Sequence, residues 1–323
     1  MTFSPIPEED NFDKDSLSEN LRIKSLELLE WPNLIKQLST FASTPMGRRS
    51  ILNFQIPLTR EESEILIKET IEMNILENEN DQKINFEGIF DIQKHVQICN
   101  KNGVLNAVDL VEIADTISAS RKLKDYIYSI ESRPLLSSIL NKLIDHVQLE
   151  KILKNGIEKS GRISDKASEK LSELRQQLNY FKNERRRLLD DFLKKNSHFL
   201  QDSIIGDRYG RPVLAVKVNY INKIKGILHD SSSSGNTIFI EPEVIASKGN
   251  KIASLKARIS NEEFKLLKKW SSLIAENYKT LIQNFDILLK IENALTRSRY
   301  SSWINGLPPK FSDNNKLTIT GFS

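Results

Sequence analysis

The 323-residue sequence has few of the residues on which catalytic and metal sites depend. It contains one cysteine, Cys99, and four histidines whose spacing matches no zinc site. A lone cysteine cannot form an internal disulfide, which fits a reducing compartment and predicts a buried structural thiol. We expect no metal site in this chain.

Nucleotide-binding and membrane-spanning signals are missing as well. None of the 12 glycines is followed by lysine, as a phosphate-binding loop requires, so we expect no ATP hydrolysis and no bound cofactor. No run approaches the roughly 20 apolar residues that cross a bilayer, and the acidic start EEDNFDKD is unlike a signal peptide. These absences predict a cytoplasmic protein that binds no membrane.

Glycine and proline are scarce, at 12 and 10 residues, so the predicted fold class is mainly α. Charge is divided unevenly: residues 1–160 contain 19 Lys and Arg against 26 Asp and Glu, whereas residues 161–323 contain 28 against 17. An excess of that size suits a surface that binds a polyanion. Lysine-rich solvated helices would give the same excess, and composition leaves both explanations open.

Two long helices are predicted in the basic half. Apolar residues at alternating three- and four-residue steps form a seam typical of a coiled coil. They are Leu171, Leu174, Leu178, Phe181, Leu188 and Phe192. This helix should run from Ser164 to Ser203, about 60 Å. A similar series from Ile252 to Leu273 predicts a second helix, from Val244 to near Arg299, that returns antiparallel to the first.

A β-like block, Arg208–Pro242, separates the two helices. It contains three candidate strands, Val213–Val218, Lys225–His229 and Thr237–Ile240, with turn residues between them. The serine run beside His229 invites a nucleophile interpretation, but neighbours in sequence do not make a triad, and we expect no catalytic residue. The pattern predicts a small antiparallel sheet at the tip of two helices.

The acidic half is predicted to be a helical core domain. An apolar helical face, Leu26–Phe41, ends near Pro45 and Gly47, and acidic residues after Thr59 mark the start of a helix that runs to about Asn78. Further helices fit residues 89–100, 107–130 and 134–154.

Basic residues cluster on the β-like block. The predicted nucleic-acid-binding residues are Arg208, Arg211, Lys217, Lys223 and Lys225. On a twisted sheet they would contact backbone phosphates along a duplex, which holds position without reading sequence. Cations at strand ends also protect sheet edges from aggregation. We favour phosphate contact, because arginines join the lysines and the sheet is expected at an exposed tip.

Two other features have a structural explanation that we prefer. Arg185–Arg187 fan around the outgoing helix, and we expect pairing with Glu262 or Glu263 of the returning helix. Tyr209 and Tyr220 flank the first strand. Stacking on bases is open to both tyrosines, but we expect them to pack across strands.

The β-like block resembles the clamp segment of the MutS family. The resemblance lies in RYGRPVLAVK from Arg208, GILHD from Gly226, and SSGNT followed by FIEP up to Pro242. More narrowly, these motifs and the run from Leu26 to Gly47 are similar to the second bacterial subfamily, which lacks the mismatch-reading domain. Together they cover most of residues 24–300.

The resemblance implies a helical core domain, a lever of two long antiparallel helices, and a small β clamp at its tip that embraces DNA through the backbone. Family members continue into an ATPase domain, which binds ATP and Mg²⁺ and makes the main homodimer contacts, and often into a C-terminal endonuclease domain. Those activities map to no residue here, and we expect the homodimer of full-length proteins rather than of this chain.

The expected division of the chain follows from the motifs and the resemblance together. It consists of an acidic disordered tail (1–20), a helical core domain (21–160), the outgoing lever helix (161–205), the β clamp (206–242), the returning lever helix (243–300), and a linker with the start of an ATPase domain (301–323).

The leading functional hypothesis is a lever-and-clamp module that acts in DNA repair or in suppression of recombination. Such a module should prefer branched or bent duplexes, because phosphate contacts respond to shape rather than sequence. Subfamily members are also implicated in splitting stalled ribosomes, so a module that grips rRNA is an alternative. The third hypothesis is a helical fragment without activity of its own.

Overall fold

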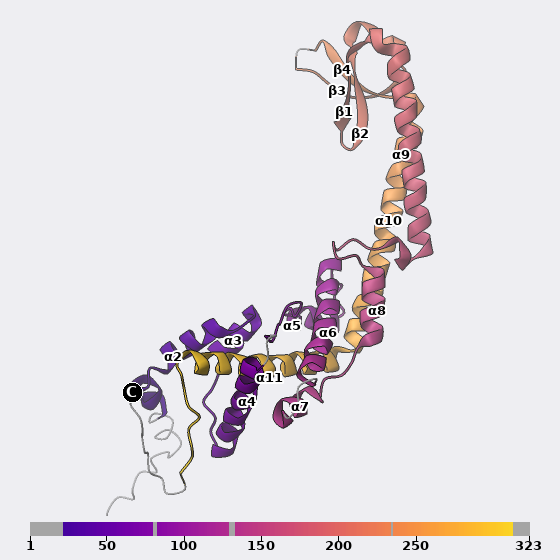
Figure 1. The fold of residues 1–323 in the computed structure, drawn as a ribbon. Coiled ribbons are helices and arrows are strands. Elements are labelled where there is room, and N and C mark those ends of the chain that lie inside the picture. Colours follow the sequence, from indigo (N-terminus) through magenta and orange to yellow (C-terminus); the bar gives the residue numbers. More distant parts are fainter. Residues whose placement is uncertain (1–21, 80–82, 129–132, 234, 313–323) are drawn as a thin grey trace, which may run out of the picture. The chain divides into compact units, whose positions relative to one another are not determined.

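The computed structural model describes residues 22–79, 83–128, 133–233 and 235–312, and it confirms a mainly α fold with one small antiparallel sheet (Figure 1). The predicted tail, residues 1–20, and the last part of the predicted linker lie outside the described residues. The chain divides into two compact units. The first consists of residues 1–101, 112–150 and 275–323, and the second of residues 102–111 and 151–274.

The first unit is organised around helix α11 (Tyr278–Trp303). The helices that contact it are α2 (Trp31–Leu38), α3 (Pro45–Leu52), α4 (Arg60–Glu79), α5 (Gln93–Asn100) and α7 (Pro134–Leu140). Two further helices, α6 (Ala107–Tyr128) and α8 (Val147–Gly156), contribute residues to both units. Leu281, Phe285, Leu288 and Leu295 of α11 are buried, because their spacing places them on one face.

Helix α3 is fixed against α11 by a buried carboxylate. Pro45, near which the first predicted helix was expected to end, lies in the first turn of α3. Its missing N–H costs nothing there, because the first N–H groups of a helix have no partner within the helix. Thr44 donates to Glu292 from its backbone N–H (2.6 Å) and from Oγ1 (2.7 Å). A Cβ at Gly47 would lie 2.1 Å from the Glu292 Cδ, so this approach requires glycine.

Two antiparallel helices, α9 (Glu169–Asn196) and α10 (Glu243–Glu276), run side by side in the second unit (Figure 1). Ion pairs report their register: Lys170 Nζ lies 3.2 Å from Glu262 Oε2, and Lys248 Nζ lies 3.0 Å from Glu184 Oε2. Because partly exposed ion pairs contribute little, the apolar residues between the helices should contribute more to stability. Those buried from the predicted series are Leu171, Leu174, Ile252, Leu255 and Ile259.

Helix α9 is shorter than the predicted helix Ser164–Ser203. Its 28 residues span about 42 Å. Ser168 caps its start by accepting a hydrogen bond from the Leu171 N–H (3.3 Å), and the Asn196 side chain donates to the Phe192 carbonyl at its end (2.9 Å). The residues that follow form a strand that the prediction missed, because their apolar spacing fits a helix as well as a strand.

The sheet of the second unit has four antiparallel strands in the order β1-β2-β4-β3. They are β1 (Leu200–Arg208), β2 (Arg211–Lys217), β3 (Gly226–Ser231) and β4 (Thr237–Pro242). Strands β2, β3 and β4 correspond to the three predicted strands. The additional strand β1 pairs with β2 through a two-residue turn, which sets Arg208 opposite Arg211.

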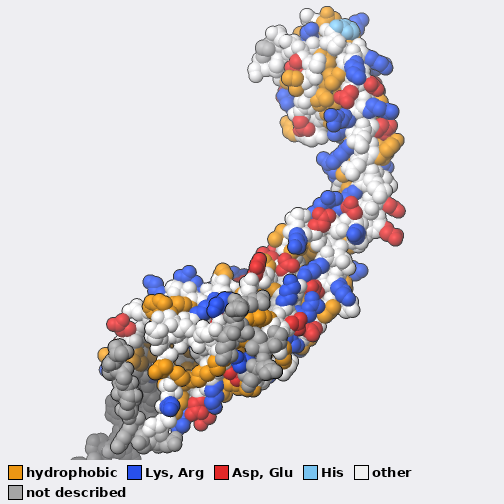
Figure 2. Space-filling model, viewed as in Figure 1, with side chains coloured by type: hydrophobic (Ala, Val, Ile, Leu, Met, Phe, Trp, Pro, Cys, Tyr) orange, Lys and Arg blue, Asp and Glu red, His pale blue; other side chains and the backbone are white. Residues whose placement is uncertain are grey.

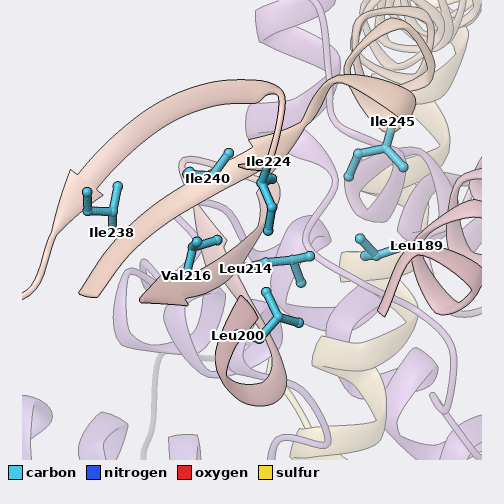
Figure 3. Packing of buried hydrophobic residues seen from close by; sticks show 8 residues of the cluster. All are labelled: Leu189, Leu200, Leu214, Val216, Ile224, Ile238, Ile240 and Ile245. Atoms are coloured by element: carbon cyan, nitrogen blue, oxygen red, sulfur yellow. The ribbon is translucent and has the colours of Figure 1, made fainter. Parts of the chain in front are cut away.

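A small hydrophobic core joins the sheet to both helices (Figure 3). Leu214 and Val216 of β2 pack with Ile240 of β4, with Leu189 of α9 and with Ile245 of α10. Alternation along β2 and β4 directs these residues to one face of the sheet. The sheet is therefore attached to the helix pair by packing as well as by the chain itself.

The predicted helical face Leu26–Phe41 is interrupted at Leu29 and Glu30, where Glu30 has φ of 50° and α2 begins at the next residue. Two other helix breaks were not predicted. The helix predicted from Val244 to Arg299 is interrupted at Asn277, and the helix predicted over residues 134–154 is divided into α7 and α8. At the second break, Asn284 of α11 accepts a hydrogen bond from the Ile144 N–H (2.9 Å) and donates one to the Ile144 carbonyl (2.7 Å). These two breaks lack the glycine or proline that would reveal them in sequence.

Candidate nucleic-acid interface

The turn between β1 and β2 carries two of the predicted residues, Arg208 and Arg211. Tyr209 and Gly210 form this turn with φ of 55° and 77°, as in a type I′ hairpin. Asp207 Oδ1 accepts a hydrogen bond from the Gly210 N–H (2.9 Å) and holds the turn closed. A left-handed conformation costs a residue such as Tyr209 roughly 1–2 kcal/mol.

Arg208 is held on the surface of the sheet. Its guanidinium carbon lies 4.2 Å from the centre of the Phe239 ring, and its Nε lies 3.8 Å from Asp230 Oδ2. The side chain is 34% exposed. Its Nη1 also donates to the Asp207 carbonyl (3.0 Å), so the ring, the carboxylate and the carbonyl hold the guanidinium in place, and its exposed part is available to an anion from solvent.

Arg211 belongs to a charged cluster inside the second unit. Its Nη1 lies 3.1 and 3.0 Å from the two oxygens of Glu241, which is fully buried, and its Nη2 donates to Asn250 of α10 (2.6 Å). His229 Nε2 lies 3.2 Å from the same carboxylate. A buried carboxylate needs such partners. The side chain of Arg211 therefore joins β2 to β4 and α10, and 31% of it remains exposed.

The three predicted lysines differ in their surroundings. Lys217 Nζ lies 3.4 Å from the His198 carbonyl oxygen. Lys223 and Lys225 are exposed, and their side chains have no hydrogen-bond or ion-pair partner within the part of the chain that the structure describes. These two ammonium groups are the most available of the five predicted cations.

The sheet register gathers some of these residues and separates others. Gly226 pairs with Pro242, so the start of β3, next to Lys225, lies at the same end of the sheet as the β1–β2 turn. Lys217 pairs with Thr237 at the opposite end. The predicted residues thus form no single patch: Arg208, Arg211 and Lys225 share one end of the sheet. Figure 2 shows further Lys and Arg side chains along α9 and α10.

The predicted pairing of Arg185–Arg187 with Glu262 or Glu263 is wrong. The register places Lys170 beside Glu262, where its ammonium lowers the pKa of that carboxyl, and Glu263 accepts from Arg175 (2.7 Å). Residue 185 lies about 22 Å along α9 from residue 170. Arg186 and Arg187 are exposed and make no hydrogen bond or ion pair with any described residue. The sequence prediction of the interface therefore missed them.

The expected cross-strand packing of the two tyrosines is also wrong. Tyr220 lies in a 3₁₀ turn, Val218–Lys223, and contacts Phe199 with ring centres 5.2 Å apart. Tyr209 is 95% exposed at the β1–β2 turn.

Cys99 is buried, as predicted.

Among the described residues, no three His, Cys, Asp or Glu side chains are grouped closely enough to hold a metal ion. Over those same residues, no helix combines the length and apolar character needed to cross a membrane.

Comparison with protein-family profiles finds no match. Individual relatives are similar over most of the chain. Endonuclease MutS2 from Synechocystis sp. is 31% identical over 308 residues, which cover 94% of this chain and 38% of the relative. Endonuclease MutS2 from Symbiobacterium thermophilum is 30% identical over 279 residues (86% and 35%), and that from Clostridioides difficile is 30% identical over 302 residues (92% and 38%).

The chain spans less than two fifths of the length of these three relatives. Their similarity extends across both units and supports a place in the MutS family, in agreement with the resemblance of the β-like block.

Proposed function

We propose that the chain is the core, lever and clamp portion of a protein of the second bacterial MutS subfamily, and that its second unit grips DNA by the phosphate backbone. In this proposal α9 and α10 are the lever, and strands β1–β4 are the clamp. The observation that carries it is a pair of exposed lysines, Lys223 and Lys225, whose side chains have no partner among the described residues and that lie just before strand β3. The sheet bears the clamp motifs of a family whose members align with nearly the whole chain.

Counterion release explains how such a surface would bind. Each phosphate that a lysine or arginine neutralises frees condensed cations from the nucleic acid, so affinity should fall steeply with salt. Contacts of this kind position a duplex without reading its bases. A duplex that is already bent or branched presents more phosphates to a compact clamp, and we expect it to bind more tightly than a straight duplex.

ATP hydrolysis and DNA cleavage are not assigned to residues of this chain. The resemblance implies that an ATPase domain binds ATP and Mg²⁺ and makes the homodimer contacts. In the printed sequence no glycine is followed by lysine, as a phosphate-binding loop requires. The proposal therefore concerns binding alone.

Binding of the purified chain to a four-way DNA junction, a linear duplex of equal length and an rRNA helix, measured across a salt series, tests the proposal. We expect salt-sensitive binding of DNA with the junction preferred. Preference for the rRNA helix would favour a module that grips the ribosome. Absence of binding near physiological salt would mean that the fold has no nucleic-acid affinity of its own.

A further inference from the structure

The β1–β2 turn places an aromatic side chain in solvent in a backbone conformation that aromatic residues rarely adopt. Tyr209 is 95% exposed with φ of 55°. Asn followed by Gly is the favoured pair for such a turn, because asparagine tolerates the left-handed region far better than tyrosine does. The turn alone does not explain a tyrosine here.

Packing does not explain it either. Tyr209 makes no hydrogen bond or ring contact with any residue that the structure describes. A Cβ built on the adjacent Gly210 would meet nothing within 4 Å, so the space around the turn is open. Arg211, which closes the turn, reaches Asn250 of α10 (2.6 Å), but no such contact is made by Tyr209 within the described residues. Figure 1 shows the backbone of this turn at the end of the β1–β2 hairpin.

The turn is nevertheless held in place. Asp207 accepts from the Gly210 N–H (2.9 Å), and Arg208 lies over Phe239 at 4.2 Å. An aromatic ring on a preorganised turn loses little conformational freedom when it binds. Two cations lie at the same end of the sheet, since Arg208 precedes Tyr209 in β1 and Lys225 precedes β3.

We propose that Tyr209 stacks on an unpaired or extruded base of the nucleic acid that the clamp grips. The inference rests on the proposed function, because the cations at this end of the sheet must first hold the phosphates. Every base offers a π face, so an aromatic ring can stack on it without reading sequence. A bulge or a junction exposes such bases and a continuous duplex does not. Tyr209 would thus add recognition of unpaired structure to a grip on the backbone.

The test compares a continuous DNA duplex with the same duplex carrying one bulged 2-aminopurine, and repeats both as RNA. Tyr209→Asn keeps a residue that suits the turn and removes the ring. We expect it to weaken binding of the bulged duplex by about 5- to 150-fold, the range for loss of one base–aromatic stack, and to leave continuous duplex unchanged. Tyr209→Phe should retain full affinity, because stacking needs the ring and not the hydroxyl.

Two controls keep the result specific. Tyr180→Gln removes another exposed tyrosine, 62% exposed on α9, and should change neither affinity. Thermal unfolding should show Tyr209→Asn to be at least as stable as the wild type, so lost binding cannot be ascribed to unfolding. Quenching of 2-aminopurine fluorescence should accompany binding by the wild type and by Tyr209→Phe but not by Tyr209→Asn.

Equal affinity of wild type and Tyr209→Asn for the bulged duplex, with salt-sensitive binding intact, would overturn this inference and leave the proposed function standing. A loss of equal size for bulged and continuous duplexes would overturn it too. If the wild type binds neither duplex with salt sensitivity, the proposed function fails and the inference fails with it. The RNA arm decides which nucleic acid supplies the base.

Discussion

Replacing Arg211 by alanine should destabilise the sheet of the second unit, whether or not a ligand is bound. The substitution removes the guanidinium that contacts both oxygens of the fully buried Glu241 and takes away the partner of Asn250. Removing one member of a buried ion pair costs about 3–5 kcal/mol. Arg211 is 31% exposed and His229 stays 3.2 Å from Glu241, so solvent and the remaining partner reduce the cost to about 2 kcal/mol.

Hydrogen exchange of the β2 and β4 amides measures this local loss. A cost of about 2 kcal/mol predicts roughly 30-fold faster exchange at these amides. Adding Glu241→Gln to Arg211→Ala removes the uncompensated charge and should recover part of the stability. Lys225→Ala is the matched control. It removes an exposed cation at the same end of the sheet, and it should leave exchange unchanged while lowering nucleic-acid affinity.

The reasoning is refuted if Arg211→Ala exchanges like the wild type and yet loses nucleic-acid binding. Arg211 would then be a phosphate contact rather than a residue that positions β2 against β4 and α10. A double variant no more stable than Arg211→Ala alone would contradict the assigned role of the Glu241 charge.

Three further predictions concern other parts of the molecule. Gly47→Ala should lower the free energy of unfolding of the first unit in urea by about 3 kcal/mol, since the new Cβ displaces Glu292. In a Glu292→Ala background the same substitution should cost less than about 1 kcal/mol. Equal costs in the two backgrounds would exclude the clash. Arg186→Gln/Arg187→Gln should change stability by less than about 0.5 kcal/mol but weaken nucleic-acid binding, and unaltered affinity would remove α9 from the interface. Burial lowers the pKa of His146 below its ordinary 6.5, with Asp145 opposing the shift, so the native state holds its proton less tightly than the unfolded chain. Stability should therefore fall as the pH drops through 6.5 toward the native pKa of His146. The variant His146→Gln should show a weaker dependence of the unfolding midpoint on pH over that range. An unchanged dependence would contradict this prediction.

Periodicity made most of the helices and three of the strands predictable. Leu171 and Leu174 of α9, with Leu255 and Ile259 of α10, repeat at helical spacing and are buried where the pattern indicates. Strand β1 was missed, because its apolar residues also fit a helix. The breaks at Asn277 and around Ile144 were missed because a distant side chain, Asn284, holds the second one and no glycine or proline marks either.

Composition predicted which region of the chain holds the candidate interface, but it could not predict which basic residues of that region already have partners. A cluster of basic residues identifies the β-like block, yet only the fold distinguishes Lys223, whose side chain has no partner in the described part of the chain, from Arg211, which is bound to Glu241. The availability of Arg186 depends on the register of α9 and α10, which the apolar repeat leaves undetermined. Tyr209 looked like a packing residue in sequence, because its exposure follows from the pairing of β1, the strand that was missed.

The slope of log binding constant against log salt on a four-way DNA junction tests the central claim most directly. For Lys223→Gln/Lys225→Gln we predict a slope smaller in magnitude than the wild-type slope by about 1.8, because two phosphate contacts are lost. The control, Lys36→Gln/Lys94→Gln, removes two exposed cations of the first unit and should keep the wild-type slope. Identical slopes for all three proteins would contradict a clamp that grips nucleic acid through its phosphates.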